Sequence, residues 1–181
     1  MNFPLLSSLI ILPTIGAIFI LFGRSSTNYN SAKYISLFIT FTNFVLSLYL
    51  WYTFDKTNSD FQFVEERIWL EGFINYKVGI DGISILFIIL TTFITFLCVI
   101  SVNSTVQNRL KDFLLAILFM ETMMIGVFCS LDLVIFYLFF EAGLIPMFLI
   151  IGIWGGQRRV YSAFKFFLYT LLGSVLMLVA I

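Results

Sequence analysis

The sequence predicts an all-α membrane protein, a polytopic bundle of about six transmembrane helices. Its 181 residues are 61% hydrophobic and 11% charged, whereas a soluble domain has about 45–50% apolar and about 25% charged residues. The mean hydropathy is +1.06. Apolar stretches of about 20 residues, which cross about 30 Å of hydrocarbon at about 1.5 Å per residue, recur along the chain. So few charges exclude a soluble globule, and 23 phenylalanines with three prolines exclude a disordered chain.

The apolar stretches define six expected spans within a single transmembrane domain over residues 1–181. They lie at approximately 3–22, 34–54, 83–102, 113–129, 133–154 and 160–181. The first stretch has no basic region before it and no small-x-small cleavage site, so we expect an uncleaved span rather than a signal peptide. The last stretch runs to Ile181 without a polar end. We therefore expect either a fragment or a chain that a partner continues.

The charged residues alternate between the loops, and this pattern predicts the orientation. One side carries seven basic residues and one acid: Arg24, Lys33, Arg109, Lys111, Arg158, Arg159, Lys165 and Asp112. The long loop 55–82 on the other side carries three basic residues and six acids: Lys56, Arg67, Lys77, Asp55, Asp60, Glu65, Glu66, Glu71 and Asp81. By the positive-inside rule the first side faces the cytoplasm or matrix, and the N-terminus and loop 55–82 face outside.

Loop 55–82 is expected to hold a short β-hairpin. Its centre, FQFV at 61–64 followed by IWL at 68–70, is rich in the aromatic and β-branched residues that favour strands. We expect the hairpin to pack on the membrane surface.

Two aspartates are expected to cap helices. Asp81 and Gly82 form a predicted turn and N-cap ahead of the third span, with Ser84 beside them. A catalytic role for Asp81 is the alternative. Asp132, in the tight connection between the fourth and fifth spans, is expected to cap the fifth span with its carboxylate facing water.

Two glutamates are predicted to lie near the centre of the bilayer. Glu121 precedes the connection at 131–132 by about ten residues, and Glu141 follows it by about the same number. At about 1.5 Å per residue both lie roughly 15 Å from that connection, so the two spans place them at a common depth. A carboxylate at this depth costs about 2.5–3.5 kcal/mol on insertion scales, and such residues usually have a function.

Glu141 has the more specialised surroundings. Pro146 cannot donate the hydrogen bond that the Ala142 carbonyl would accept, and Gly143 thins the helix near the carboxyl. A free carbonyl beside an acid in a kinked helix offers a place for water, so Glu141 is expected to exchange protons. The alternative is a protonated glutamate that bonds to a neighbouring helix as structural glue. For Glu121 the two interpretations stand equally.

Lys165 lies about one turn into the sixth span. It is expected to face the bundle interior and to influence Glu141 through water, with snorkelling toward the inner surface as the alternative. The expected axial separation of roughly 10 Å does not favour a direct salt bridge between the two.

Other classes of function are not favoured. Ten basic residues spread over the chain form no stripe for a phosphate backbone, so no nucleic-acid partner is expected. Cys98 and Cys129 lie in apolar runs without a CxxC motif, and we expect apolar fillers rather than a disulfide or a metal site. The sequence has no histidine to bind zinc or haem or to act as a triad base.

Five strings of residues resemble a known family. They are GIDGIS at 79–84, LDLVIFYLFFE at 131–141, LIPMF at 144–148, IWG at 153–155 and KFFLYT at 165–170. In this order, and over essentially the whole chain, they resemble the chain 4 family of NADH:ubiquinone oxidoreductase. Bacterial counterparts and the Mrp-type cation/proton antiporter subunits share a similar pattern. The richness in Phe, Ile, Asn and Tyr suits an AT-rich mitochondrial genome, so the mitochondrial inner membrane is expected, with the bacterial plasma membrane as the alternative.

The resemblance implies a proton-pumping, antiporter-like subunit in the membrane arm of respiratory complex I, a translocase. In that family the glutamate of the fifth span, here Glu141, is a key residue of the proton pathway and pairs with a lysine of the seventh span. Family members have many more spans, so the sequence is expected to be an N-terminal portion that needs a separate C-terminal piece. Flavin and iron–sulfur clusters belong to other subunits of the family, and no cofactor is expected in this chain.

The sequence therefore predicts a proton pathway through Glu141, Lys165 and Glu121, of which Glu141 is the strongest candidate. Other membrane-arm subunits and membrane lipids are the expected partners. Two alternatives stay open, a cation/proton antiporter subunit outside respiration and a non-catalytic membrane scaffold whose acids are interhelical glue.

Overall fold

The computed structural model describes residues 4–22, 29–55, 57–58, 60–70, 74–106 and 109–180. In chain order the elements of this part are α1 (Leu5–Phe22), α2 (Tyr29–Thr53), β1 (Gln62–Leu70), β2 (Ile74–Ile80), α3 (Ser84–Thr105), α4 (Leu110–Cys129), α5 (Leu133–Trp154) and α6 (Arg159–Ala180). All six helices are long and apolar enough to cross a bilayer. The prediction of a helical bundle with six spans is therefore confirmed.

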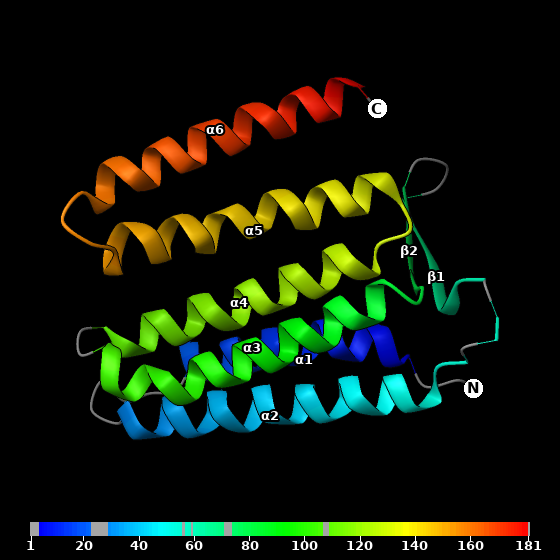
Figure 1. Cartoon of the computed structure of the whole chain (residues 1–181), viewed down its shortest axis with the longest axis horizontal. Helices are drawn as coiled ribbons and strands as arrows, with labels where there is room; N and C mark the ends of the chain where they lie inside the picture. The colour runs from blue at the N-terminus through cyan, green and yellow to red at the C-terminus, as the bar shows by residue number, and fades with distance from the viewer. Residues whose placement is uncertain are drawn as a thin grey trace.

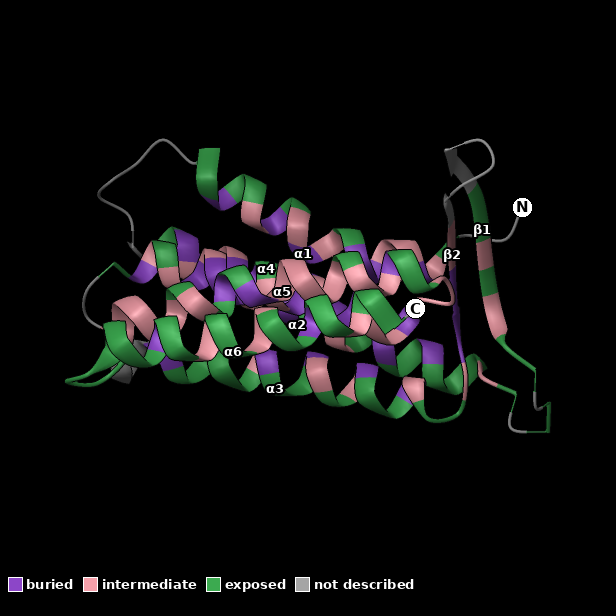
Figure 2. Ribbon diagram, turned by 90° about the horizontal axis from the view of Figure 1, so that it is seen from above, coloured by how far each residue is buried: buried purple, intermediate pink, exposed green. Residues whose placement is uncertain are grey.

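The helices lie side by side and alternate in direction, with α4 in the middle of the bundle (Figure 1). Helix α4 packs against α1, α2, α3 and α5, and half of its spanning residues are buried. Helix α6 packs on α5 at the edge, and only 11% of its spanning residues are buried. Figure 2 shows the same contrast, because exposed residues dominate the visible face of α6. The centre of the fold is therefore α4.

The two ends of the bundle differ in charge as the sequence predicts. The hairpin and the α4–α5 connection lie at one end, and the α3–α4 and α5–α6 connections lie at the other (Figure 1). The second end carries the basic residues Arg109, Lys111, Arg158 and Arg159. It is therefore the end that the positive-inside rule assigns to the inner side. Three of the charges used for this prediction lie outside the described residues: Arg24, Lys56 and Glu71.

Helix α5 is delimited by the residues at its two ends. Asp132 Oδ1 accepts hydrogen bonds from the Val134 and Ile135 amides at 2.8 and 3.2 Å, so the predicted N-cap is confirmed. At the other end the Gly155 amide donates to the Ile151 carbonyl. A Cβ on Gly155 would lie 2.3 Å from that carbonyl oxygen, so only glycine fits where the helix stops.

Three helices are longer than their apolar stretches. Helix α2 begins at Tyr29 rather than at residue 34, because the polar segment YNSAK at 29–33 continues the helix beyond the hydrocarbon. Helix α3 runs to Thr105, three residues past the expected end, and α4 begins at Leu110, three residues before the expected start at 113. Hydropathy measures the length of chain that lies in lipid, and a helix can extend past it into the interface.

The expected hairpin is present, although its strands differ from the prediction. The segments 61–64 and 68–70 do not pair with one another, because residues 62–70 form the single strand β1. Strand β2 pairs with it antiparallel, and Glu66 lies opposite Lys77 with their charged atoms 3.6 Å apart. The sequence of β2, INYKVGI, alternates apolar and other residues, which is the signal for a strand with one buried face.

The hairpin is attached to the bundle through the α4–α5 connection. The Leu131 amide donates to the Lys77 carbonyl at 3.0 Å, and Val78 forms a β-bridge with Ser130. A Cβ on Gly79 would lie 2.7 Å from Leu131 Cδ1, so glycine lets the connection lie close to β2. The strand therefore closes the outer end of the bundle.

The core has an apolar cluster at each end and a polar layer between them. The outer cluster consists of Leu6, Leu9, Ile10, Leu50, Val78, Ile80, Ile85, Ile88, Ile125 and Cys129. The inner cluster consists of Ile20, Ala32, Val99, Val102, Leu110, Leu114, Ile117 and Leu118. The buried residues of the polar layer are Thr40, Asn43, Ser47, Thr92, Thr95, Glu121 and Thr122. Along α2, α3 and α4 this layer lies between the two clusters, at the depth of the membrane centre.

Candidate functional site

Glu141 lines an open cavity on the face of α5 beside α6. The cavity has a volume of about 520 Å³, and its wall includes Tyr137 and Ala142 of α5 and Phe167 of α6. The Glu141 side chain is half-buried, and its Oε2 atom is buried without a hydrogen-bond partner among the described residues. The cavity therefore offers room for water beside the side chain, and the buried Oε2 has unused hydrogen-bonding capacity.

The sequence around Glu141 explains this local structure. Pro146 lies inside α5, and because it has no amide hydrogen the Ala142 carbonyl receives no helical hydrogen bond. A Cβ on Gly143 would lie 3.6 Å from Met123 Cβ, so this side of α5 is in van der Waals contact with α4. Glu141 is therefore followed by a residue whose carbonyl lacks its helical donor, and α4 lies on one side of α5 with the cavity on the side toward α6.

Glu121 has different surroundings, because its side chain is fully buried inside the polar layer. Asn43 Nδ2 of α2 donates a hydrogen bond of 2.8 Å to Glu121 Oε1. Thr95 of α3 lies next to the same carboxyl. The second oxygen, Glu121 Oε2, and the amide oxygen of Asn43 are both buried without a partner in the described part of the chain.

The two glutamates lie at similar depths but do not meet. A Cβ built on Gly126 would touch Phe139, and a Cβ built on Gly143 would touch Met123, so these residues of α4 and α5 lie side by side. This register places Glu121 level with about residue 144, so the two glutamates differ by about one turn, or about 5 Å. Glu121 points toward α2 and Glu141 toward the cavity beside α6. The two carboxyls therefore have separate environments.

Lys165 is exposed on α6, and its Nζ lies 6.0 Å from the centre of the Tyr161 ring. Gly152 of α5 lies opposite Ala163 of α6, because a Cβ built on Gly152 would be 3.7 Å from the Ala163 Cβ. The same register places Lys165 about nine residues, or about 13 Å, from Glu141 along the bundle. Its influence on Glu141 stays a prediction.

Asp81 acts as the predicted cap of α3. Its Oδ1 accepts a hydrogen bond of 2.7 Å from the Ser84 amide. Hydrogen bonds from the Ser84 hydroxyl and amide hold the pKa of the Asp81 carboxyl below its ordinary value of 3.8. The structure therefore supports the cap rather than the catalytic alternative.

Glu65 has a role that the sequence did not reveal. Its carboxylate, on β1, accepts hydrogen bonds from the Leu6 amide at 2.9 Å and from the Ser7 amide at 3.2 Å. It also accepts a hydrogen bond from the Ser7 hydroxyl, which lies 3.2 Å from the Tyr76 hydroxyl. Glu65 thus caps the first turn of α1 from the hairpin. The signal available in the sequence was weak: Pro4, directly before the first residue of α1, has no side-chain acceptor.

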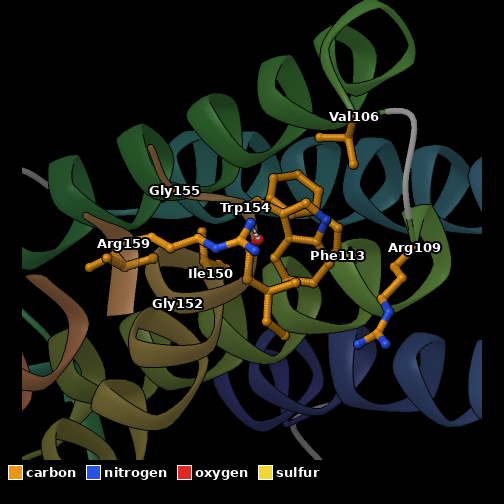
Figure 3. A pocket seen from close by; sticks show the side chains of 10 residues that line it. Val106, Arg109, Phe113, Ile150, Gly152, Trp154, Gly155 and Arg159 are labelled. Atoms are coloured by element: carbon orange, nitrogen blue, oxygen red, sulfur yellow. Dashed lines mark hydrogen bonds between the residues drawn. The ribbon is translucent and has the colours of Figure 1, made fainter. Parts of the chain in front are cut away.

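A second and larger cavity opens at the inner end of the bundle. It has a volume of about 1120 Å³ and is lined by residues that include Arg109, Phe113, Trp154 and Arg159. Figure 3 shows the rings of Phe113 and Trp154 between the two arginine side chains. Arg159 Nη1 donates to the Ile153 carbonyl at 2.7 Å. The described residues that line this cavity include no carboxyl group.

Comparison with known proteins identifies the family. A family model described as "NADH:quinone oxidoreductase/Mrp antiporter, TM" matches residues 130–181, which include Glu141 and Lys165. NADH-quinone oxidoreductase subunit M of Rhodobacter capsulatus is 59% identical over 150 residues, 83% of this chain and 29% of that protein. NADH-ubiquinone oxidoreductase chain 4 of Marchantia polymorpha is 46% identical over 178 residues, 97% of this chain and 36% of that protein. The chain thus spans 29% of the length of the first relative and 36% of the length of the second.

A solved structure shares the fold. It is the structure of the membrane-bound sulfane sulfur reductase (MBS), an archaeal respiratory membrane complex. The match has a TM-score of 0.75 and covers 95% of this chain and 26% of the other at 18% identity, so it supports the fold alone. The sequence identities carry the assignment: the chain is a homologue of subunit M, or chain 4, of NADH:quinone oxidoreductase and belongs to this antiporter-like transmembrane family.

Proposed function

We propose that these residues belong to a proton-translocating subunit in the membrane arm of complex I. In this proposal the assembled enzyme transfers electrons from NADH to ubiquinone, and the subunit moves protons across the membrane. Flavin and iron–sulfur clusters would lie in other subunits of the complex, since the relatives are single subunits of NADH:quinone oxidoreductases. The relatives are longer, and we propose that residues 1–181 act together with the remaining spans of such a subunit, whether these lie on the same chain or on a second one.

The observation that carries the proposal is the position of Glu141. Its carboxyl lies in an apolar helix, lines a cavity, and has a buried oxygen without a partner among the described residues. Because a permanently charged carboxylate is costly in this position, the group gains by binding a proton when no positive charge is near. It can release the proton when a positive charge approaches or when water reaches it. Glu141 would therefore carry the proton.

Lys165 would modulate this step rather than pair with Glu141. Two unit charges about 13 Å apart interact by about 1 kcal/mol at an effective dielectric constant of about 20. Moving one charge through a membrane potential of 100 mV involves about 2.3 kcal/mol. The lysine would therefore shift the proton affinity of Glu141 by less than the membrane potential can, and it would not hold the carboxyl in one protonation state.

The test is the variant Glu141→Gln in the assembled enzyme. Glutamine keeps the size and hydrogen-bonding groups of the side chain but cannot release a proton. We expect assembly to be retained and proton-coupled quinone reduction to fall at least tenfold, measured as NADH oxidation in sealed membrane vesicles. Glu66→Gln, which changes an exposed glutamate of the hairpin, serves as the matched control. An unchanged rate in Glu141→Gln would reject the assignment.

A cation/proton antiporter subunit of the Mrp type is the second candidate, because the matched family model covers both classes. That function predicts sodium-dependent transport and no co-purifying flavin or iron–sulfur proteins. Mass spectrometry of the chains that co-purify with this protein distinguishes the two. The same experiment identifies the partners and tests the proposed mitochondrial inner membrane against a bacterial plasma membrane. A non-catalytic scaffold instead predicts that glutamine at both glutamate positions lowers stability but not turnover.

A further inference from the structure

Two unpartnered oxygens in the centre of the bundle belong to the two partners of one hydrogen bond. Asn43 Nδ2 donates to Glu121 Oε1 at 2.8 Å. Asn43 Oδ1 and Glu121 Oε2, the remaining oxygens of these same two groups, are buried without partners in the described part of the chain. Both are acceptors as long as Glu121 is ionised, so neither can satisfy the other.

The surroundings of Glu121 do not support an ionised carboxylate. Its side chain is fully buried between the two apolar clusters. The described parts of the four helices packed against α4 contain one basic residue, Lys33, which lies ten residues from Asn43 on α2. Lys111 on α4 is also ten residues from Glu121. Both are about 15 Å away along their helices, so neither is a direct counter-charge.

The neighbouring hydroxyls have other acceptors and leave Glu121 Oε2 without a partner among the described residues. The Thr95 hydroxyl donates to the carbonyls of Thr91 and Thr92. In the same layer Ser47 and Thr92 bond to one another at 2.9 Å. An ionised Glu121 would therefore have few side-chain donors, the Asn43 amide and the adjacent Thr95 hydroxyl, and its Oε2 would stay unpartnered among the described residues.

We infer that Glu121 holds a proton and donates it in a hydrogen bond to Asn43 Oδ1. Rotation of the two side chains then closes a neutral acid–amide pair: Asn43 Nδ2–H donates to Glu121 Oε1, and Glu121 Oε2–H donates to Asn43 Oδ1. One proton removes the buried negative charge and satisfies both unpartnered oxygens. The pair joins α4 to α2 at the centre of the membrane and retains its proton, unlike the carboxyl of Glu141, which lines a cavity. This inference does not depend on which ion the assembled protein transports.

Infrared spectroscopy of the purified, assembled protein tests the proton directly. The difference between wild type and Glu121→Gln should show the loss of one protonated-carboxyl C=O band, present from neutral to mildly alkaline pH. In Asn43→Leu the band should move to higher frequency, because the acid loses its hydrogen bonds to the amide. Loss of a carboxylate band in place of the protonated band would overturn the inference.

Exchange of the two groups tests the pairing. Glu121→Gln retains both hydrogen bonds, because the glutamine amide donates to Asn43 Oδ1, so the melting temperature should match wild type. Asn43→Leu should lower the yield of assembled protein several-fold. The double variant Asn43→Asp/Glu121→Gln moves the acid to α2 and should restore the yield together with the protonated-carboxyl band. If the double variant assembles no better than Asn43→Leu, or if the band does not return, the acid–amide pair is wrong.

Discussion

Glu65 supplies from the hairpin the acceptors that the first turn of α1 lacks. The amides of Leu6 and Ser7 at the start of this helix bond to its carboxylate. The positive end of the helix dipole faces this negative charge, which strengthens the contact. A single side chain thus holds a loop element on a membrane helix 58 or 59 residues away in the chain.

We expect Glu65→Ala to loosen the hairpin from α1. Hydrogen bonds to a charged group contribute about 1.5–3 kcal/mol, so protection of the β1 and β2 amides in hydrogen–deuterium exchange should fall clearly. Glu66→Ala on the same strand is the control, because its exposed ion pair with Lys77 is worth less than about 1 kcal/mol. Equal exchange in the two variants would argue against the cap.

Tyr76 gives the hairpin a dependence on alkaline pH. Burial, with a smaller contribution from the Glu65 carboxylate, raises the pKa of the Tyr76 phenol above its ordinary value of 10.0. The folded state therefore keeps this proton when the unfolded state loses it. The stability that the group contributes is complete below pH 10 and is lost as the pH rises through the pKa of the folded state.

Tyr76→Phe should remove this part of the pH dependence. Melting curves of the assembled protein between about pH 9 and 11 measure it. The wild type should lose more stability over this interval than the variant. Parallel curves for the two proteins would show that Tyr76 ionises equally in both states.

At the residue scale, hydrogen-bond partners that are close in the sequence could be predicted, and partners that are distant in the sequence could not. Asp81 and Asp132 bond to amides two or three residues ahead, and both caps were predicted. Glu65 and Glu121 are held by residues 58 and 78 positions away, and no local pattern indicates these partners. The depth of Glu121 and Glu141 could be predicted because it follows from helix rise alone.

The contact between α4 and α5 depends on a glycine. A Cβ on Gly126 would lie 2.5 to 2.7 Å from the ring of Phe139, closer than packed atoms can approach. The absence of this atom lets α5 lie close to α4 near their outer ends. This contact sets the position of the helix that carries Glu141.

Gly126→Ala should therefore weaken the α4–α5 pair. Overpacking of this kind costs about 1–3 kcal/mol, which should appear as a lower melting temperature of the assembled protein. Gly152→Ala is the matched control, since its Cβ would make an ordinary contact of 3.7 Å with Ala163. If the two variants melt at the same temperature, close approach at Gly126 is not needed.

At the element scale composition was sufficient for the helices and for the presence of the hairpin, but not for the bounds and pairing of its strands. Runs of apolar residues mark the six spans because lipid demands them. The strand pairing could not be read in the same way, because Glu65 and Glu66 interrupt the apolar character of β1 although they lie within the strand. The extension of α2 to Tyr29 was missed for a related reason, since its first turns are polar.

The whole molecule has an acidic hairpin at one end and basic connections at the other, and this fixes its predicted orientation. Single cysteines introduced at exposed positions test it: Asn58→Cys in the loop before β1 and Gln157→Cys in the α5–α6 connection. A membrane-impermeant thiol reagent should label the first from the outside and the second from the inside. Cys98 and Cys129 lie within the spans α3 and α4 and should stay unlabelled. Labelling of both new cysteines from one side would contradict the six-span topology, and reversed labelling would contradict the orientation.

The central claim is that the proton moves through the carboxyl of Glu141, and proton movement itself is the most direct measurement. Vesicles containing the assembled enzyme are given NADH and quinone, and internal acidification is followed with a pH-sensitive dye in wild type, Glu141→Gln and Glu66→Gln. We expect acidification in wild type and in Glu66→Gln, and at least a tenfold loss in Glu141→Gln at equal amounts of assembled enzyme. Acidification of Glu141→Gln vesicles at the wild-type rate would contradict the claim.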